Sequence, residues 1–404
     1  MTHNETELYI GLMCGTSIDG VDVALVDFAD GQSKLIAHYL HPVSKEVRDS
    51  LIELCDVKQT IAENIYANAL NTVSGHPVPE KIAEVVENRI ELLGRMDRQM
   101  GYVFAEAVNS FLAAQSLSPS QIKAIGSHGQ TIRHRPERET AFSIQIGDPN
   151  VIAHQTGIKT VSDFRRMDLA AGGQGAPLAP AFHNAVMRSK RENRIILNLG
   201  GIANITLLPK DPSANVLGFD TGTANTLMDA HFKRFHPKSD ELFDRDSQFA
   251  RSGRVNEQLL KVLLSDPYFK KAPPKSTGRE HFSITWLQRQ IDSCDFPISA
   301  EDIQATLLEF SAVTIADAVK NLELDNFEVY ASGGGMNNPY LLEAIGKHLG
   351  KKVFQTNDIG VDGDYLEAMT FAWLAYRRVE QLPGNLPSVT GAQSTRILGG
   401  IYLP

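Results

Sequence analysis

Short apolar runs separated by glycine turns occur twice along the chain and predict two β-hairpins. The first hairpin is predicted over residues 9–28, with its turn inside the segment GLMCGTSIDGVD at 11–22. The second has apolar runs at 195–199 and 205–208 on either side of a Gly-Gly turn. Apolar runs of this length bounded by glycine are typical of β-strands joined by tight turns. The repeated order of strand, glycine turn and strand predicts two related α/β halves.

Helical periodicity predicts helices at 46–54 and 81–113, and a short apolar run predicts a buried strand at 122–127. A later strand at 327–331 ends in three glycines and is followed by a predicted helix at 338–345.

A charged segment at 188–194 separates the two halves, and we place the domain boundary near residue 190. Domain I is predicted to span 1–190, with the C-terminal segment 380–404 packing back on it. Domain II is predicted to span 191–379.

The composition is that of an ordinary globular protein, and 404 residues are enough for two domains with separate cores. Lys and Arg number 39 against 48 for Asp and Glu, which gives a formal net charge of −9. This charge argues against non-specific nucleic-acid binding, which needs a positive surface.

Three widely spaced cysteines, Cys14, Cys55 and Cys294, form no CxxC pair, so we expect neither a disulfide framework nor a zinc site. The N-terminus lacks the pattern of a signal peptide. No apolar run approaches the roughly 20 residues of a membrane-spanning helix. We therefore expect a soluble cytoplasmic protein without a membrane partner.

The turn of the first hairpin has the chemistry of a phosphate-binding loop. Glycines let the backbone approach a bound group closely, and successive N–H groups can bind an anion. Hydroxyl groups add donors, and carboxylates suit a hydrated Mg²⁺ or a reacting hydroxyl. The loop lacks the Lys-Ser/Thr ending of a P-loop, and an ordinary hairpin stabilised by Asx turns is the alternative. The candidate ligands are Gly15, Thr16, Ser17, Asp19, Gly20 and Asp22, with Asp19 and Asp22 as candidate metal ligands.

The glycines at 333–335 stand at a junction between a strand and a helix. Such a turn lets the backbone lie against a planar or charged ligand, and the helix N-terminus adds partial positive charge. We predict nucleotide contact here, with a plain turn as the alternative.

Several long motifs together resemble the anhydro-N-acetylmuramic acid kinases, in the same order and over essentially the whole chain. The motifs are GLMCGTSIDGVD (11–22), SHGQTIRH (127–134), DFRRMDLAAGGQGAPLAP (163–180), GFDTGTANTLMDA (218–230), ASGGGMNN (331–338) and DYLEAMTFAWLA (364–375). One departure is Cys14, where the family pattern has serine. A thiol is a weaker hydrogen-bond donor than a hydroxyl, so a phosphate contact made by this side chain would be weaker.

The resemblance implies a two-domain actin-like ATPase (ribonuclease H-like) α/β fold with a central interdomain cleft, as in hexokinase, Hsp70 and actin. It implies that ATP, 1,6-anhydro-N-acetylmuramic acid and water give ADP and N-acetylmuramic acid 6-phosphate, in recycling of the bacterial cell wall. It also implies the use of Mg²⁺ and a homodimer.

Asp220 ends a predicted strand directly before a Thr-Gly-Thr turn. The resemblance implies that it is the base that activates water. The alternatives are that Asp220 caps the next helix or holds Mg²⁺. Glu367 is a candidate second catalytic carboxylate, or a residue that only caps its helix.

Gly200, Gly201 and Asn204 are predicted to form a second loop near the γ-phosphate or the sugar, or else a structural hairpin. Gly333, Gly334 and Gly335 would lie beside the adenosine or α-phosphate. Asn337 would contact the base or ribose, with a helix cap as the alternative.

The substrate carries a lactyl carboxylate, which arginine binds through two parallel hydrogen bonds. We expect one arginine of the segment 163–168 to bind it and the other to pair with Asp163 or Asp168. The predicted substrate-binding residues are His128, Gln130, Arg165, Arg166 and Asp168. The segment 275–280 has the composition of a mobile loop on the nucleotide side, although a charged surface loop is favoured.

Two other functions compete with this interpretation. A simple sugar or acetate-type kinase of the same superfamily would not place solvent oxygen at C1. An Hsp70- or actin-like module that uses ATP to change shape would need a peptide- or self-binding surface, and no β-rich peptide domain is predicted.

Overall fold

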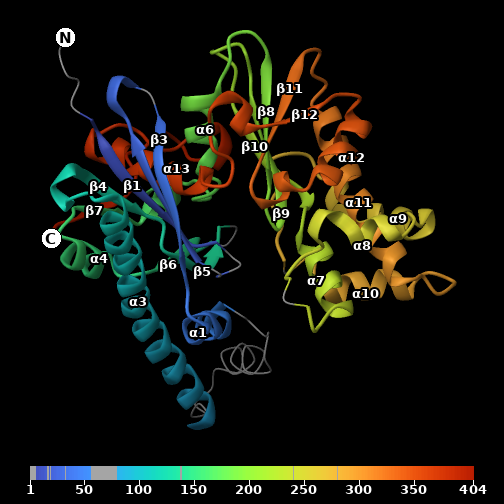
Figure 1. The fold of residues 1–404 in the computed structure, drawn as a ribbon, viewed down its shortest axis with the longest axis horizontal. Coiled ribbons are helices and arrows are strands. Elements are labelled where there is room, and N and C mark those ends of the chain that lie inside the picture. Colours follow the sequence, from blue (N-terminus) through green and yellow to red (C-terminus); the bar gives the residue numbers. More distant parts are fainter. Residues whose placement is uncertain are drawn as a thin grey trace. The chain divides into compact units, whose positions relative to one another are not determined.

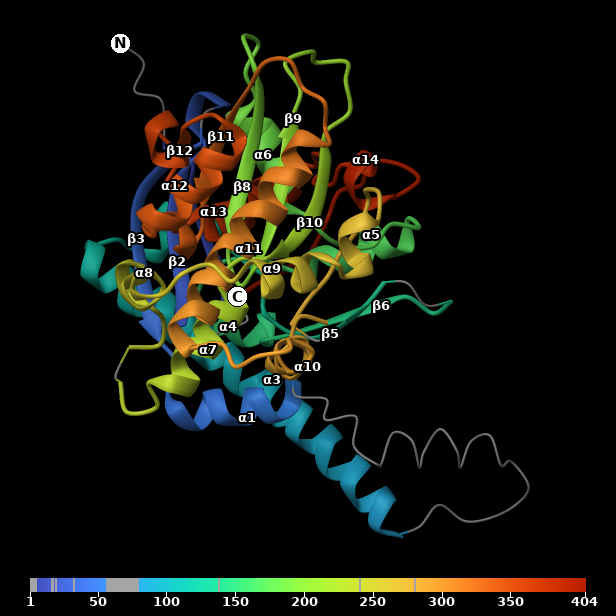
Figure 2. The same ribbon diagram turned by 90° about the vertical axis from the view of Figure 1, so that its right-hand side faces the viewer.

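The computed structural model describes residues 6–15, 18, 20–31, 33–55, 80–136, 139–239, 241–279 and 281–404. The chain forms two compact units (Figures 1 and 2). Unit 1 contains residues 1–178 and 367–404, and unit 2 contains residues 179–366.

The sequence-based boundaries near residues 190 and 380 differ from these unit limits. Helix α6 (Ala179–Met187) belongs to unit 2 because its His183 pairs with Thr206 of that unit, with Nδ1 and Oγ1 3.0 Å apart. Helix α13 (Leu366–Val379) lies almost entirely in unit 1, where it packs on the sheet. The segment 380–404 lies in unit 1, as the sequence suggested.

Unit 1 combines a mixed sheet with helices and a separate two-stranded hairpin. Its strands are β1 (Leu8–Met13), β2 (Gly20–Asp27), β3 (Lys34–Pro42), β4 (Ile122–Ser127), β5 (Gln130–Arg135), β6 (Phe142–Ile146), β7 (Thr160–Ser162) and β13 (Gly400–Tyr402). Its helices are α1 (Lys45–Cys55), α3 (Glu80–Gln115), α4 (Pro149–Thr156), α5 (Phe164–Ala170), α13 and α14 (Pro387–Thr390).

The main sheet of unit 1 has the order β13-β7-β4-β1-β2-β3. Strands β1, β2 and β3 are antiparallel neighbours, while β4 runs parallel to β1 and β7 runs parallel to β4. The predicted hairpin over 9–28 is therefore confirmed as β1 and β2, and the predicted helix at 81–113 is confirmed within α3.

Helix α3 covers one face of this sheet (Figure 1). Its Met100, Phe104 and Phe111 are at most 1% exposed and join one apolar cluster with Ile10 and Leu12 of β1. The long helix thus supplies most of the apolar cover on that face.

Helix α13 packs on the opposite face, because side chains alternate between faces along a strand. Gly11 of β1 and Gly126 of β4 are direct partners in the sheet. A β-carbon on Gly11 would lie 1.8 Å from the Ala368 carbonyl oxygen, and one on Gly126 would lie 2.0 Å from that of Phe371. The helix backbone therefore rests directly on two glycines.

Unit 2 contains a five-stranded sheet and, among its described residues, seven complete α-helices. The strands are β8 (Asn193–Leu199), β9 (Ile202–Leu208), β10 (Leu217–Thr223), β11 (Phe327–Ser332) and β12 (Val353–Gln355). The helices are α6, α7 (Thr226–Phe235), α8 (Gln248–Ser252), α9 (Glu257–Leu264), α10 (Ile284–Asp292), α11 (Ala300–Lys320) and α12 (Pro339–Leu349).

The sheet of unit 2 has the order β10-β9-β8-β11-β12. Strands β8, β9 and β10 are antiparallel neighbours, and β11 and β12 continue the sheet in parallel. This order and these directions match β3-β2-β1-β4-β7 of unit 1. The predicted pair of related α/β halves and the ribonuclease H-like fold class are thus confirmed.

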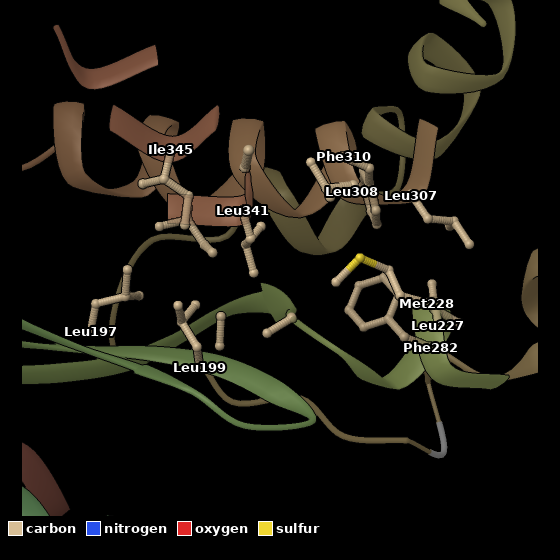
Figure 3. Close-up of a cluster of buried hydrophobic side chains, with 14 of the residues drawn as sticks. Leu197, Leu199, Leu227, Met228, Phe282, Leu307, Leu308, Phe310, Leu341 and Ile345 are labelled. Carbon is tan, nitrogen blue, oxygen red and sulfur yellow. The ribbon is translucent and has the colours of Figure 1, made fainter. Parts of the chain in front are cut away.

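One face of the unit 2 sheet is closed by α11 and α12 (Figure 3). Leu197 and Leu199 of β8 face Leu341 and Ile345 of α12, and Phe310 of α11 joins the same cluster. All five side chains are at most 1% exposed. Among the described helices, none is both long and apolar enough to cross a membrane.

We expect Gly11→Ala to lower the free energy of unfolding by about 3 kcal/mol, as overpacking of a close contact does. The added methyl group would have to displace the α13 backbone. Chemical denaturation measures the change. Gly94→Ala is the matched control, since Gly94 lies in α3 with open space around it and the substitution there should stabilise the helix by up to about 1 kcal/mol. Equal effects of the two substitutions would contradict the packing described here.

His183 makes the stability of unit 2 dependent on pH. Burial lowers the pKa of its imidazole from 6.5 to about 3, so the unfolded chain takes up a proton that the folded chain does not. The stabilisation that neutral His183 gives is fully present above pH 6.5. As the pH falls from there towards the folded pKa, the free energy of unfolding decreases by about 1.4 kcal/mol per pH unit. Denaturation of a Trp373→Phe variant, followed by the fluorescence of Trp286, measures this. In His183→Gln, the free energy of unfolding should no longer fall in this way with decreasing pH. Identical slopes of unfolding free energy against pH with and without His183→Gln would refute the assignment.

Candidate functional site

The first glycine loop is only partly described, because Thr16, Ser17 and Asp19 lie outside the described residues. Gly15 accepts a hydrogen bond through its carbonyl oxygen from the Ile18 N–H at 3.2 Å. Ile18 has a φ of 54°, in the left-handed region that side chains disfavour. Asp22 lies in β2, is paired with Met13 of β1 and is half-buried. The described part of the turn thus holds Ile18 in a disfavoured backbone conformation.

Two small residues of this loop have packing roles. A β-carbon on Gly20 would lie 2.5 Å from Leu40 Cδ1, so β3 leaves little room there. Cys14, the departure from the family pattern, is 2% exposed and belongs to the apolar cluster of unit 1.

His128 and Arg165 form the best-defined polar pair of unit 1. The Arg165 Nε and Nη2 atoms lie 3.2 and 2.8 Å from His128 Nε2, and Nη1 donates to the Gly175 carbonyl at 2.8 Å. The backbone N–H of His128 donates to Leu12 at the end of β1 at 3.1 Å. These bonds connect α5 to the ends of β1 and β4.

The protonation state of His128 follows from this geometry. Burial, followed by the Arg165 charge, holds the pKa of the imidazole well below its usual value. A guanidinium group only donates hydrogen bonds, so Nε2 must accept and the single proton lies on Nδ1. Burial lowers the pKa of Arg165 to about 10, although Glu367 and Asp168 oppose this effect, so the guanidinium stays charged at neutral pH.

Asp168 is fully buried and is bonded within unit 1. Its Oδ1 accepts from Asn385 at 2.6 Å and from Thr390 at 2.8 Å, and its Oδ2 accepts from the Gly175 N–H at 2.8 Å. The carboxylate therefore ties the C-terminal segment to the loop that holds Arg165. Its predicted contact with the substrate stays a prediction.

Arg166 Nε donates a bifurcated hydrogen bond to both carboxylate oxygens of Asp163, each at 2.8 Å. The side chain is 68% exposed. The sequence predicted that one of the two arginines would pair with Asp163 or Asp168, and Arg166 is that residue.

The other two candidates of unit 1 lie on neighbouring elements. Gln130 is 2% exposed, and its Oε1 has no hydrogen-bond partner in the described chain. Glu367 is exposed in the first turn of α13 and interacts electrostatically with Arg165. The ring of Phe371, one turn further along, lies 4.6 Å from that of His128.

In unit 2, Asp220 is anchored by a distant part of the chain. Its Oδ2 accepts hydrogen bonds from Ser276 Oγ and from the Thr277 N–H, both at 2.9 Å. Its backbone N–H donates to the Lys275 carbonyl at 3.1 Å, and its carbonyl accepts from the Tyr268 hydroxyl at 2.7 Å. We call residues 275–279 the Asp220 loop. The sequence favoured a charged surface loop here and gave no signal of this anchoring.

Asp220 also ends a row of polar residues across the sheet. It is the direct partner of Asn204, which is the partner of Asn198, which is the partner of Ser332. The row lies on the face opposite the core residues Leu197 and Leu199, because side chains alternate along a strand. Asn204 is thus placed beside Asp220.

The Gly200–Gly201 turn is closed by the start of α7. The carbonyl of Gly201 accepts from the Ala224 and Thr226 N–H groups at 3.0 and 3.1 Å. Asn225 Nδ2 donates to the Gly200 carbonyl at 2.8 Å. One predicted alternative was that Asp220 caps this helix. In the structure, carbonyl groups of the glycine turn accept the hydrogen bonds from the N–H groups at the start of α7.

The glycines at 333–335 follow β11 and open a short 3-10 helix (Gly334–Asn337). Gly333 has a φ of 75°, and a β-carbon there would lie 2.4 Å from Asn198 Oδ1. Gly334 is exposed with open space beside it. The cap of α12 is Asn338, whose side chain accepts from the Leu341 N–H, whereas Asn337 is exposed and donates to Asp364 at 3.1 Å.

A magnesium site in the first loop stays a prediction from the sequence. Within the described ranges, no three His, Cys, Asp or Glu side chains gather into a metal-binding group. Mg²⁺ bound with a nucleotide usually has one or two carboxylate ligands, with phosphate oxygens and water completing the shell. Half-buried Asp22 suits such a role.

Comparison with known proteins identifies close relatives. The family model of anhydro-N-acetylmuramic acid kinase matches residues 7–89 and 76–404. Proteins of that name from Coxiella burnetii and Xylella fastidiosa are each 45% identical to the chain. The first alignment covers 98% of this chain and 97% of the relative, and the second covers 99% and 97%.

Solved structures resemble the chain more distantly. The activator of 2-hydroxyisocaproyl-CoA dehydratase from Clostridium difficile is 12% identical with a TM-score of 0.42, covering 93% of this chain and 96% of that one. Xylulose kinase from Rhodospirillum rubrum is 14% identical with a TM-score of 0.37, covering 98% and 94%. With these TM-scores, the fold is argued from the sheet topology described above and not from these structures.

We expect Arg165→Met to raise the pKa of His128 towards its usual value, because the neighbouring positive charge is removed while burial remains. The neighbouring substitution Arg166→Met should leave this pKa unchanged, since Arg166 pairs with Asp163. NMR titration of the imidazole nitrogens measures both variants. An unchanged His128 in Arg165→Met would contradict the assigned contact.

Proposed function

Because the chain belongs to the anhydro-N-acetylmuramic acid kinase family, we propose how its own residues carry out that family's reaction. The protein is an ATP-dependent kinase of cell-wall sugar recycling. In the proposed reaction, water opens 1,6-anhydro-N-acetylmuramic acid at C1, and the released O6 takes the γ-phosphate of ATP. The products are ADP and N-acetylmuramic acid 6-phosphate.

The observation that carries the proposal is the anchored carboxylate of Asp220. Ser276 and Thr277 both donate to one of its oxygens, which fixes the plane of the carboxylate at the end of β10. A base must be held in a fixed direction to take a proton from water as it attacks the anomeric carbon. We assign Asp220 this role and Glu367 the role of a second carboxylate at the sugar.

The sugar-binding residues are proposed to be those around Arg165. Its guanidinium is held by His128 and Gly175 and keeps further N–H groups for the lactyl carboxylate. Arg165 suits this role better than Arg166, whose side chain is largely exposed and paired with Asp163. Gln130 supplies a buried amide oxygen for a substrate hydroxyl or N–H group.

Three glycine turns are proposed to bind ATP. The 15–22 loop and the Gly200–Gly201 turn would approach the phosphates, and the exposed Gly334 would lie beside the nucleotide, with Asn337 at the base or ribose. Asp22, together with Asp19, would hold Mg²⁺, which neutralises charge on the phosphates when bound. A homodimer and a cytoplasmic location stay predictions from the sequence.

We expect Asp220→Asn to lower the rate of sugar phosphorylation by about 1000-fold, the scale of a lost general base, while ATP binding is largely kept. An amide can still accept hydrogen bonds from Ser276 and Thr277, so the loop should remain in place. Asp211→Asn, at an exposed turn of unit 2, is the control and should retain full activity.

Mass spectrometry of the product in ¹⁸O-labelled water measures both the phosphate transfer and the opening of the ring. Label at C1 is expected from the wild-type protein. A phosphorylated product without label would favour the simple sugar kinase, and undiminished turnover by Asp220→Asn would refute the assigned base.

A further inference from the structure

Arg279 lies at the end of the Asp220 loop, directly against the Gly200–Gly201 turn. Its Nη2 and Nε atoms are 3.2 and 3.5 Å from the position that a β-carbon would take on Gly201. The segment 275–280 has the composition of a loop on the nucleotide side, but no role was predicted for this residue from the sequence. Within the described chain, its guanidinium has no hydrogen-bond or ion-pair partner, although the Asp229 carboxylate interacts with it electrostatically.

The surroundings of this guanidinium are polar and incompletely bonded. Thr226 Oγ1 lies 2.7 Å from the same β-carbon position and has no hydrogen-bond partner among the described residues. The hydroxyl of Thr277, two residues before Arg279 in the same loop, also lacks a hydrogen-bond partner among the described residues. Unsatisfied buried polar atoms are costly, so these hydroxyls are suited to bind a polar group beside Arg279.

We propose that Arg279 binds the terminal phosphate of ATP above the Gly200–Gly201 turn. The inference rests on the proposed function and adds a residue to it. A guanidinium presents several N–H donors in a plane that matches phosphate oxygens. Gly201 is required at this point, because a side chain would occupy the space between the guanidinium and the turn.

The anchoring of the loop explains how Arg279 is held. Thr277, two residues before it, donates to the Asp220 carboxylate. Asp229 of α7 supplies negative charge nearby, and burial raises the pKa of its carboxyl to about 7, an effect that Arg279 reduces and Asp244 increases. One short piece of chain, the Asp220 loop, therefore both anchors the proposed base and carries the phosphate-binding cation.

The charge of Arg279 would be used most in phosphate transfer. As the bond from O6 to phosphorus forms and the bond to the ADP oxygen breaks, negative charge spreads over the three equatorial phosphate oxygens. A fixed cation beside these oxygens stabilises that arrangement more than it stabilises bound ADP.

Calorimetric binding of ADP and of a non-hydrolysable ATP analogue tests the assignment. Arg279→Gln should weaken the analogue about 10-fold, the effect of a lost charged hydrogen bond, and leave ADP unchanged. Arg279→Lys should recover part of the loss. Lys270→Gln removes an equal charge from an exposed neighbouring position and should change neither affinity.

Steady-state kinetics give a second measurement. Arg279→Gln should lower kcat about 100-fold, as loss of one transition-state donor does, with a nearly unchanged KM for the sugar. An unchanged ratio of analogue to ADP affinity in Arg279→Gln would overturn the inference. If the wild-type protein made no sugar phosphate, the proposed function would fail instead, while the affinity ratio would still decide the role of Arg279.

Discussion

The direct contact between the backbone of α13 and two paired glycines determines the arrangement of unit 1. Gly11 and Gly126 are partners on adjacent strands, and no other residue would let the carbonyls of Ala368 and Phe371 come so close. This contact fixes the height of α13 above the sheet. It thereby brings Glu367, at the start of the helix, into the electrostatic reach of Arg165.

In unit 2, too, the backbone conformation orients a polar side chain, that of Asp220. The pairing of β9 with β10 shifts register between Asp220 and Gly222, as in a β-bulge. A bulge bends the strand and re-aims its side chains, and it often stands next to an active site. Gly222 has a φ of 148°, which glycine adopts readily. The irregularity thus lies within two residues of the proposed base.

The sequence predicted those parts of the fold that depend on local pattern. The β1–β2 hairpin, the long helix α3 and the repeat of strand order follow from apolar periodicity and glycine turns, which act over short stretches of chain. The domain limits were less predictable. Helix α6 joins unit 2 because His183 meets Thr206, and this contact has no local signature.

The candidate site shows the same limit. Motifs indicated Asp220, Arg165 and the glycine turns, but the bonds that orient them come from residues far away in sequence. Ser276 and Thr277 lie more than 50 residues beyond Asp220, and Asp168 bonds to Asn385 and Thr390 near the C-terminus. Only the folded chain shows which polar residues are partners.

These distant partners suggest how the two chemical events of the reaction are kept in step. Water attack needs a carboxylate held in one direction, and phosphate transfer needs a cation held beside the phosphate. In unit 2 both proposed groups depend on the Asp220 loop, since Thr277 bonds to Asp220, the proposed base, and Arg279 lies against the glycine turn. A displacement of this loop would disturb both groups together. With the proposed roles of Asp220 and Arg279, a single anchored segment would therefore couple ring opening to phosphate transfer.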